Sequence, residues 1–438
     1  MLARCGQTEK ALETVARNLE VDPFDYVSRF VGYRITGDAS DLSAMQQLMR
    51  GFSGNYLAAG RDFLEAGLDE EAFEILNLYE GEDPLVDYYR GFAIRKDSPL
   101  KALAFYEKAE KDDSSCCFPN KLEDILVLRD AAWTLEGHGR DCAKACYYLG
   151  CLYYDKLQYE KARNLWERSE KMDDSFPTVH RNLALVYFNK MNRPDDALRE
   201  MEKAFSLDES DARVFLELDQ LYKKLEVPVP ERLAKYESHA ELPMKRDDLL
   251  VEELTLRNTQ GQYESVYQKI MGHSFRPWEG GEGKVPMQYK TSLVQMAVRS
   301  LKAGDAMDAK HKLELALTYP ENLGEGRLEG TKDNHIWYWL GRANEALGQS
   351  GESVRCYQNA ELGVDEPAGA MYYYDQPADM ILFKGLAKSK LGKKKEACAC
   401  FNKLMDYGEK HVRDVMEYDY FAVSMPDFLI FDTDLTRK

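Results

Sequence analysis

The sequence lacks any long hydrophobic run, and none of its apolar stretches approaches the roughly 18 residues that a membrane-spanning helix needs. Its first ten residues, MLARCGQTEK, also lack the apolar segment of a signal peptide. Basic residues are in the minority, with 58 Lys and Arg against 76 Asp and Glu, so the formal net charge is −18. A surface with this charge repels phosphate, and the sequence therefore predicts neither nucleic acid nor membrane as a partner.

Cysteine and histidine are also scarce, at nine and seven residues. An odd number of cysteines without a secreted-scaffold pattern favours a reducing, cytoplasmic location. The spacing of His138, Cys142, Cys146 and Cys151 allows a metal site, but the last two fall inside a repeat helix, where cysteine acts as a small apolar residue. No phosphate-binding glycine loop, zinc-protease motif or nucleophile elbow is present. We therefore expect no cofactor, no metal and no catalytic residue in this chain.

The sequence does contain a recurring spacing of small residues. A Gly or Ala near the middle of one predicted helix is followed by a small residue in the next, with a bulky side chain four positions later. Small residues at these places let two helices cross closely. The spacing is twelve residues for Gly341 and Ser353, Gly150 and Ala162, Gly60 and Ala72, Gly385 and Ala397, and Ala297 and Ala309, and thirteen for Ala184 and Ala197.

This pattern resembles the tetratricopeptide repeat, a helical hairpin of about 34 residues with the consensus W-x2-L-G-x2-Y…A-x3-F-x2-A…P. The best copy begins at Trp337, Leu340 and Gly341 and continues to Tyr357 and Ala360. The resemblance implies an all-α fold, a right-handed α-solenoid of tetratricopeptide-type helical hairpins. An irregular Gly-rich loop and an extended C-terminal tail interrupt and end that pattern.

Breaks in the pattern suggest a division of the chain into four parts. Residues 1–113 are predicted to form irregular N-terminal repeats whose first unit is truncated, which favours a chain cut from a longer protein. Residues 114–248 are predicted to hold the central repeats. Residues 249–410 are predicted to hold the C-terminal repeats, with the Gly-rich loop at 272–288, and residues 411–438 a tail that caps the last helix.

A narrower resemblance involves the segments Phe275–Val285 (FRPWEGGEGKV) and Tyr420–Asp427 (YFAVSMPD). Both resemble signatures in the C-terminal repeat half of large bacterial proteins that carry an N-terminal galactose-mutarotase-like domain of unknown function. Those proteins are often linked with carbohydrate metabolism. The resemblance implies that a sugar-handling β-sandwich would precede this chain, and it supplies no catalytic residue.

The Gly-rich loop provides the first candidate site, a ligand or domain contact made by Trp278, Glu279, Glu282 and Lys284. Its glycines would let a ligand approach the backbone closely, its Trp could stack on a sugar ring, and paired carboxylates can hydrolyse glycosides at the right separation. The alternative is a structural loop whose Trp fills a gap between repeats.

The concave groove of a solenoid is the second candidate, because the first helix of each hairpin lines it. Spacing along those helices places Tyr147, Tyr154, Arg181, Phe188, Tyr338, Arg342 and Glu345 in the groove. Aromatic and Arg side chains suit protein or peptide docking, although ordinary contacts between repeats would use the same residues. The sequence thus predicts a scaffold that binds a protein, a peptide or its own upstream domain. The alternative is the C-terminal half of a carbohydrate-active enzyme, in which loop 275–285 contributes to a sugar site on an absent β-sandwich.

Overall fold

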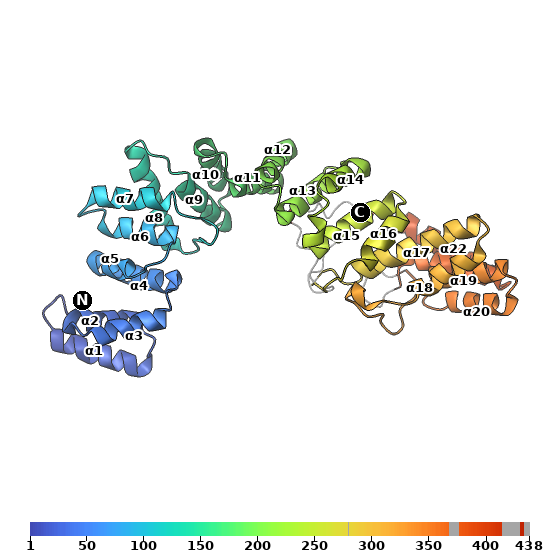
Figure 1. Cartoon of the computed structure of the whole chain (residues 1–438), viewed down its shortest axis with the longest axis horizontal. Coiled ribbons are helices and arrows are strands. Elements are labelled where there is room, and N and C mark those ends of the chain that lie inside the picture. Colours follow the sequence, from blue (N-terminus) through green and yellow to red (C-terminus); the bar gives the residue numbers. More distant parts are fainter. Residues whose placement is uncertain (279, 368–375, 414–429, 433–438) are drawn as a thin grey trace. The chain divides into compact units, whose positions relative to one another are not determined.

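The computed structural model describes residues 1–278, 280–367, 376–413 and 430–432. Within these residues every regular element is helical, with 22 α-helices, two short 3-10 helices and no strand. The predicted all-α fold is therefore confirmed (Figure 1). The chain divides into two compact units, Met1–Met191 and Asn192–Lys438, which we call unit 1 and unit 2. The four-part division of the sequence stays a prediction.

Unit 1 consists of helices joined mostly by short turns, and sequence neighbours pack against each other. Its helices are α1 (Thr8–Val21), α2 (Tyr26–Thr36), α3 (Ala39–Met49), α4 (Ser53–Glu65), α5 (Asp69–Asn77), α6 (Pro84–Ile94), α7 (Pro99–Ala109), α8 (Leu122–Gly137), α9 (Ala143–Asp155), α10 (Tyr159–Met172) and α11 (Pro177–Met191).

Unit 2 continues the same arrangement, with longer connections before α17 and α19. Its helices are α12 (Pro194–Leu207), α13 (Ala212–Lys224), α14 (Val229–Ser238), η1 (Pro243–Lys245), α15 (Asp247–Thr259), α16 (Tyr263–Met271), α17 (Lys284–Lys302), α18 (Ala306–Ala316), η2 (Glu321–Leu323), α19 (Asn334–Ala346), α20 (Ser350–Ala360), α21 (Ala378–Lys390) and α22 (Lys394–His411).

Acidic residues and prolines mark the helix starts, as their physical chemistry requires. The Asp83 side chain accepts a hydrogen bond from the Leu85 N–H, while Pro84 occupies the first turn of α6, where a missing N–H is harmless. Asp211 likewise caps α13 through the N–H groups of Arg213 and Val214. A carboxylate at this place also interacts favourably with the positive end of the helix dipole.

The small residues of the repeat pattern lie where paired helices cross. A Cβ atom added at Gly150 would stand 2.3 Å from Nε1 of Trp166, and one at Gly341 would stand 2.5 Å from the ring of Tyr357. Gly385 is covered in the same way by Phe401. In each case the ring belongs to the second helix of the same hairpin. The ring thus packs over the glycine of its own hairpin.

The Gly-rich loop is shorter than the sequence predicted. Helix α17 begins at Lys284, so residues 284–288 of the predicted irregular loop are helical. Pro286 does not prevent this, because it lies in the first turn. Most of the predicted capping tail lies outside the described residues. Within it, Phe431 is buried and the carbonyl of Asp432 accepts a hydrogen bond from Lys224 of α13.

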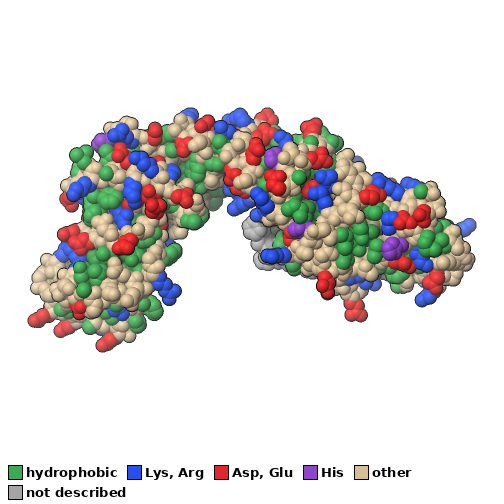
Figure 2. All heavy atoms as spheres, viewed as in Figure 1, with side chains coloured by type: hydrophobic (Ala, Val, Ile, Leu, Met, Phe, Trp, Pro, Cys, Tyr) green, Lys and Arg blue, Asp and Glu red, His purple; other side chains and the backbone are tan. Residues whose placement is uncertain are grey.

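The surface carries both signs of charge. On the face that Figure 2 shows, acidic and basic side chains are interspersed over α12–α14 and are not separated into patches of one sign. None of the described helices is both long and apolar enough to cross a bilayer.

Candidate functional site

The Gly-rich loop between α16 and α17 is a folded connection tied to its surroundings by polar contacts. Asp247, at the start of α15, accepts a hydrogen bond from the backbone N–H of Arg276 at 2.7 Å and lies 2.7 Å from Nε2 of His273. The N–H of Phe275 donates to the carbonyl of Asn322 at 2.9 Å. These contacts hold the first half of the loop against α15 and η2.

Trp278 is half-buried and packs against the hydrophobic core that α15 to α19 share. A Cβ atom added at Gly281 would stand 2.0 Å from the Trp278 ring, so the loop's own backbone lies over this indole. Packing of this kind is what the structural interpretation of the loop expects.

The polar residues of the loop are arranged around Gly283. Its N–H donates to Oε2 of Glu325 at 2.8 Å, and burial, with a smaller contribution from the charge of Glu282, raises the pKa of Glu325. Glu282 is exposed, Lys284 begins α17 and is half-buried, and Glu279 lies outside the described residues. The role of this loop in a ligand, domain or sugar site stays a prediction.

In unit 1 the predicted groove residues come from α9 and α11. Tyr147 and Tyr154 lie on one face of α9, and both are half-buried, as are Arg181 and Phe188 of α11. Nδ2 of Asn182 lies 3.6 Å from Sγ of Cys151, which places the two helices side by side at this point. The structure therefore brings the α9 and α11 residues together on adjoining helices.

Electrostatics at the same place argue against nucleophilic chemistry. Burial raises the pKa of the Cys151 thiol to about 11, although the positive charge of Arg181 acts in the opposite direction. Burial also raises the pKa of Tyr147. Both groups are thus protonated near neutral pH, and a protonated thiol is a poor nucleophile. The α9 and α11 face offers aromatic surface, hydrogen-bond donors and a cation.

In unit 2 the predicted groove residues lie on α19, where α21 packs against them. Tyr338 is 6% exposed, and its ring centroid is 5.9 Å from that of Phe383. Glu345 forms an ion pair with Lys390 at 2.8 Å, and this contact holds the pKa of Glu345 below its usual value. Arg342 is partly exposed and lies 3.4 Å from Glu345. These residues are engaged by the neighbouring hairpin, and their role in binding stays a prediction.

Two cysteines of the candidate metal site, Cys142 and Cys146, are buried core residues. Sγ of Cys142 lies 3.7 Å from Sγ of Cys146 and 3.9 Å from Sδ of Met172, and both cysteines are fully buried. His138 is exposed, and its Nδ1 contacts the carbonyl of Thr134 at 2.8 Å. All nine cysteines are unpaired in the part of the chain that the structure describes.

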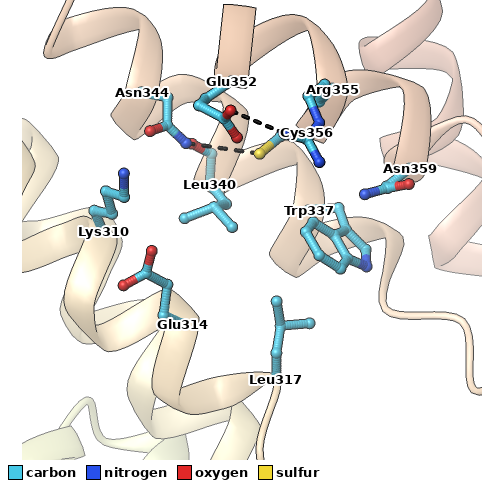
Figure 3. A pocket seen from close by; sticks show the side chains of 10 residues that line it. All are labelled: Lys310, Glu314, Leu317, Trp337, Leu340, Asn344, Glu352, Arg355, Cys356 and Asn359. Carbon is cyan, nitrogen blue, oxygen red and sulfur yellow. Dashed lines mark hydrogen bonds and ion pairs between the residues drawn. The ribbon is translucent and has the colours of Figure 1, made fainter. Parts of the chain in front are cut away.

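A pocket that the sequence analysis missed lies in unit 2 among α18, α19 and α20 (Figure 3). Its volume is about 330 Å³. Each helix contributes residues three or four positions apart, which lie on one face of that helix. The lining residues are Lys310 and Glu314 of α18 and Leu317 directly after it, Trp337, Leu340 and Asn344 of α19, and Glu352, Arg355, Cys356 and Asn359 of α20.

Comparison with known proteins gives one family match. The tetratricopeptide repeat family model matches residues 378–409, which cover α21 and most of α22. Similar solved structures include MamA (41-end) from Desulfovibrio magneticus RS-1, at 19% identity and a TM-score of 0.27, over 44% of this chain and 97% of that one.

Two further structures are similar to longer parts of the chain. A tetratricopeptide repeat protein from Parabacteroides merdae ATCC 43184 is 17% identical with a TM-score of 0.26, over 66% of this chain and 98% of that one. The P58(IPK) TPR domain is 13% identical with a TM-score of 0.24, over 90% of this chain and 96% of that one. The hairpin of α21 and α22 is therefore a tetratricopeptide repeat, and the regular elements in the rest of the described chain are helical as well.

Proposed function

We propose that this protein is a binding scaffold without catalysis of its own, which holds a protein or peptide segment against the α9 and α11 face. The observation that carries this proposal is the meeting of Tyr147 and Tyr154 with Arg181 and Phe188 on adjoining helices. Aromatic and Arg side chains contribute most of the binding energy in many protein interfaces. An upstream domain of a longer polypeptide is one such partner.

The chemistry of the face supports binding over catalysis. The thiol and phenol that sit deepest in it are held protonated by burial, and Arg181 supplies a permanent charge. Tyr147, Tyr154 and Phe188 supply aromatic surface on this face. We therefore expect the bound segment to carry an apolar or aromatic side chain.

Site-specific photo-crosslinking in extracts of the native cell tests the proposal. A benzophenone amino acid would replace Tyr154 in the full chain, and a matched variant would carry it at Asn164, an exposed position on α10. We expect one discrete protein adduct from position 154 and none from position 164. Equal adducts from both positions, or no adduct from position 154, would contradict the proposal. A second variant, Arg181→Glu, should abolish the adduct.

A further inference from the structure

Two helix junctions of this protein are closed by the same hydrogen bond. The hydroxyl of Tyr187, on α11, donates to Glu167 of α10 at 2.9 Å. The hydroxyl of Tyr222, on α13, donates to Glu202 of α12 at 2.7 Å. The tyrosines are 4% and 5% exposed, so each ring fills the space between the second helix of one hairpin and the first helix of the next.

The two partners occupy fixed positions in the repeat. Each glutamate comes five positions after the small residue of its helix, Ala162 or Ala197. Each tyrosine stands at the last position of the W-x2-L-G-x2-Y pattern, three positions after the place of the small residue. The same rule predicts which residues should meet at any other junction.

The junction between α18 and α19 keeps only half of this pair. Glu314 comes five positions after Ala309, as the rule requires. Three positions after Gly341, however, the sequence has Asn344 in place of tyrosine. The pocket of about 330 Å³ lies at this place, with Glu314 and Asn344 both in its lining. The pocket is thus located where a phenol ring stands at the other two junctions.

The polar groups around the pocket are incompletely bonded. Asn344 is 2% exposed, and its Nδ2 donates to the carbonyl of Leu340, but its Oδ1 has no hydrogen-bond partner in the described chain. A buried oxygen without a donor is unfavourable. Glu314 is exposed, and its side chain makes no hydrogen bond or ion pair with any described residue, so its carboxylate can accept a hydrogen bond from a group in the pocket. Figure 3 shows Glu314, Leu340 and Trp337 directed toward the space between the three helices.

We propose that this pocket binds the tyrosine side chain of a partner peptide. The ring would lie against Trp337, Leu340 and Leu317, and its hydroxyl would donate to Glu314 as Tyr187 and Tyr222 donate to their own glutamates. A cavity of about 150 Å³ already holds benzene, so the pocket has room for a phenol.

The rest of the lining favours a peptide tyrosine over a free phenol or a phosphotyrosine. Asn359 and the Glu352–Arg355 ion pair, at 3.0 Å, offer donors and acceptors beyond the ring site, which a peptide backbone uses and a free phenol does not. Glu314 and Glu352 would repel a phosphate group. This site lies on helices other than α9 and α11, so it does not depend on the function proposed above.

Calorimetry on the full chain tests the proposal with short peptides blocked at both ends. A peptide of the form Gly-Tyr-Gly should bind, and replacing its Tyr by Phe should weaken binding about tenfold, because one hydrogen bond to a charged acceptor is lost. The phosphotyrosine peptide should not bind. If p-cresol binds as tightly as the Tyr peptide, the peptide source is overturned. No binding of the Tyr peptide, or equal binding of the Phe peptide, also overturns the proposal.

Two variants identify the pocket as the place of binding. Asn344→Tyr supplies the missing ring from within, and we expect a higher melting temperature and at least about tenfold weaker peptide binding. Glu314→Gln, at an exposed position, should weaken binding of the Tyr peptide but not of the Phe peptide, and we expect its melting temperature to equal that of the original chain. Unchanged Tyr-peptide binding by both variants would show that the peptide binds elsewhere.

Discussion

The guanidinium of Arg232 forms a two-pronged ion pair with the carboxylate of Asp219, at 2.8 and 2.7 Å, between α14 and α13. The hydroxyl of Tyr236 also donates to Asp219, at 2.9 Å. Asp219 is 2% exposed and Arg232 is 6% exposed. A buried charge is tolerated only when it is paired and hydrogen-bonded, and here both conditions are met.

Removing one partner of this pair should destabilise unit 2. We expect Asp219→Ala to lower the free energy of unfolding by about 3 kcal/mol, because the buried Arg232 would lose both of its short contacts and keep only the longer ion pair with Glu252 at 3.8 Å. Urea unfolding followed by circular dichroism measures the change. The double variant Asp219→Ala with Arg232→Met should recover a large part of the loss. A double variant that is less stable than the single one would contradict this account.

Glycine 150 should not accept even a methyl group. In Gly150→Ala the new Cβ would stand 2.3 Å from Nε1 of Trp166, whose N–H donates to the carbonyl of Tyr147 at 3.1 Å. We expect a loss of about 1–3 kcal/mol from overpacking. Gly408→Ala in α22 is the matched control, because nothing lies within 4 Å of its Cβ position, and it should gain about 0.5–1 kcal/mol. Thermal melts that rank the two variants in the reverse order would refute this expectation.

His335 should make the protein less stable in mild acid. Burial, with a smaller effect of the Lys290 charge, lowers the pKa of His335 to about 4, while Asp333 acts in the opposite direction. The unfolded chain has an ordinary histidine pKa of about 6.5, so it binds more protons than the folded chain between pH values of about 6.5 and 4. Stability is therefore lost as the pH falls through this window.

Substitution of this histidine provides the measurement. The melting temperature of His335→Gln should fall less steeply from pH 7 to pH 4 than that of the original chain. Above pH 7 the two melting temperatures should change with pH in parallel. The exposed His138, changed to Gln, is the control and should follow the original curve. Parallel curves for His335→Gln and the original chain would show that His335 does not cause the acid sensitivity.

Asp247 should determine the order of the Gly-rich loop. Asp247→Ala removes the acceptor of the Arg276 N–H and the contact with His273. We expect hydrogen exchange to become about tenfold or more faster at residues 273–278, and to stay unchanged in α19 and α20. Asp248→Ala is the control, because Asp248 pairs with Arg246 and not with the loop. Equal acceleration in both variants would mean that the loop responds to the start of α15 in general.

The parts of the structure that repeat were predictable from the sequence. The constant spacing of Gly150, Gly341 and Gly385 from their partners identified the helix pairs, because only close crossings need a small residue there. The ion pair of Asp219 was not predictable. Asp219 occupies a position that is small in other repeats, and its charge is stable there only because the fold places Arg232 of α14 beside it. The contacts of Asp247 with the Gly-rich loop were not predictable either, because they join residues far apart in the sequence.

The pocket had a signal that the sequence analysis did not use. The repeat that begins at Trp337 fits the consensus well, yet it ends the W-x2-L-G-x2-Y pattern with Asn344. A short polar residue at a position where other repeats bury an aromatic ring indicates unfilled space. The sequence alone could not show what this space binds, because only the fold brings Glu314 close to it. Departures from a good repeat are therefore as informative as matches to it.

The packing of an aromatic ring over each of these glycines also restricts where residues can be inserted into the chain. The number of positions from the glycine to its ring is the same for Gly150 and Trp166, Gly341 and Tyr357, and Gly385 and Phe401. An added residue inside one of these hairpins would displace the ring from its glycine. The stretch between α18 and α19 bears no such restriction and already holds η2 and further irregular residues. Growth is therefore tolerated better between hairpins than inside a hairpin that is closed by a glycine and its ring, and the hairpin from Ala184 to Ala197, which has no glycine at this place, is one residue longer.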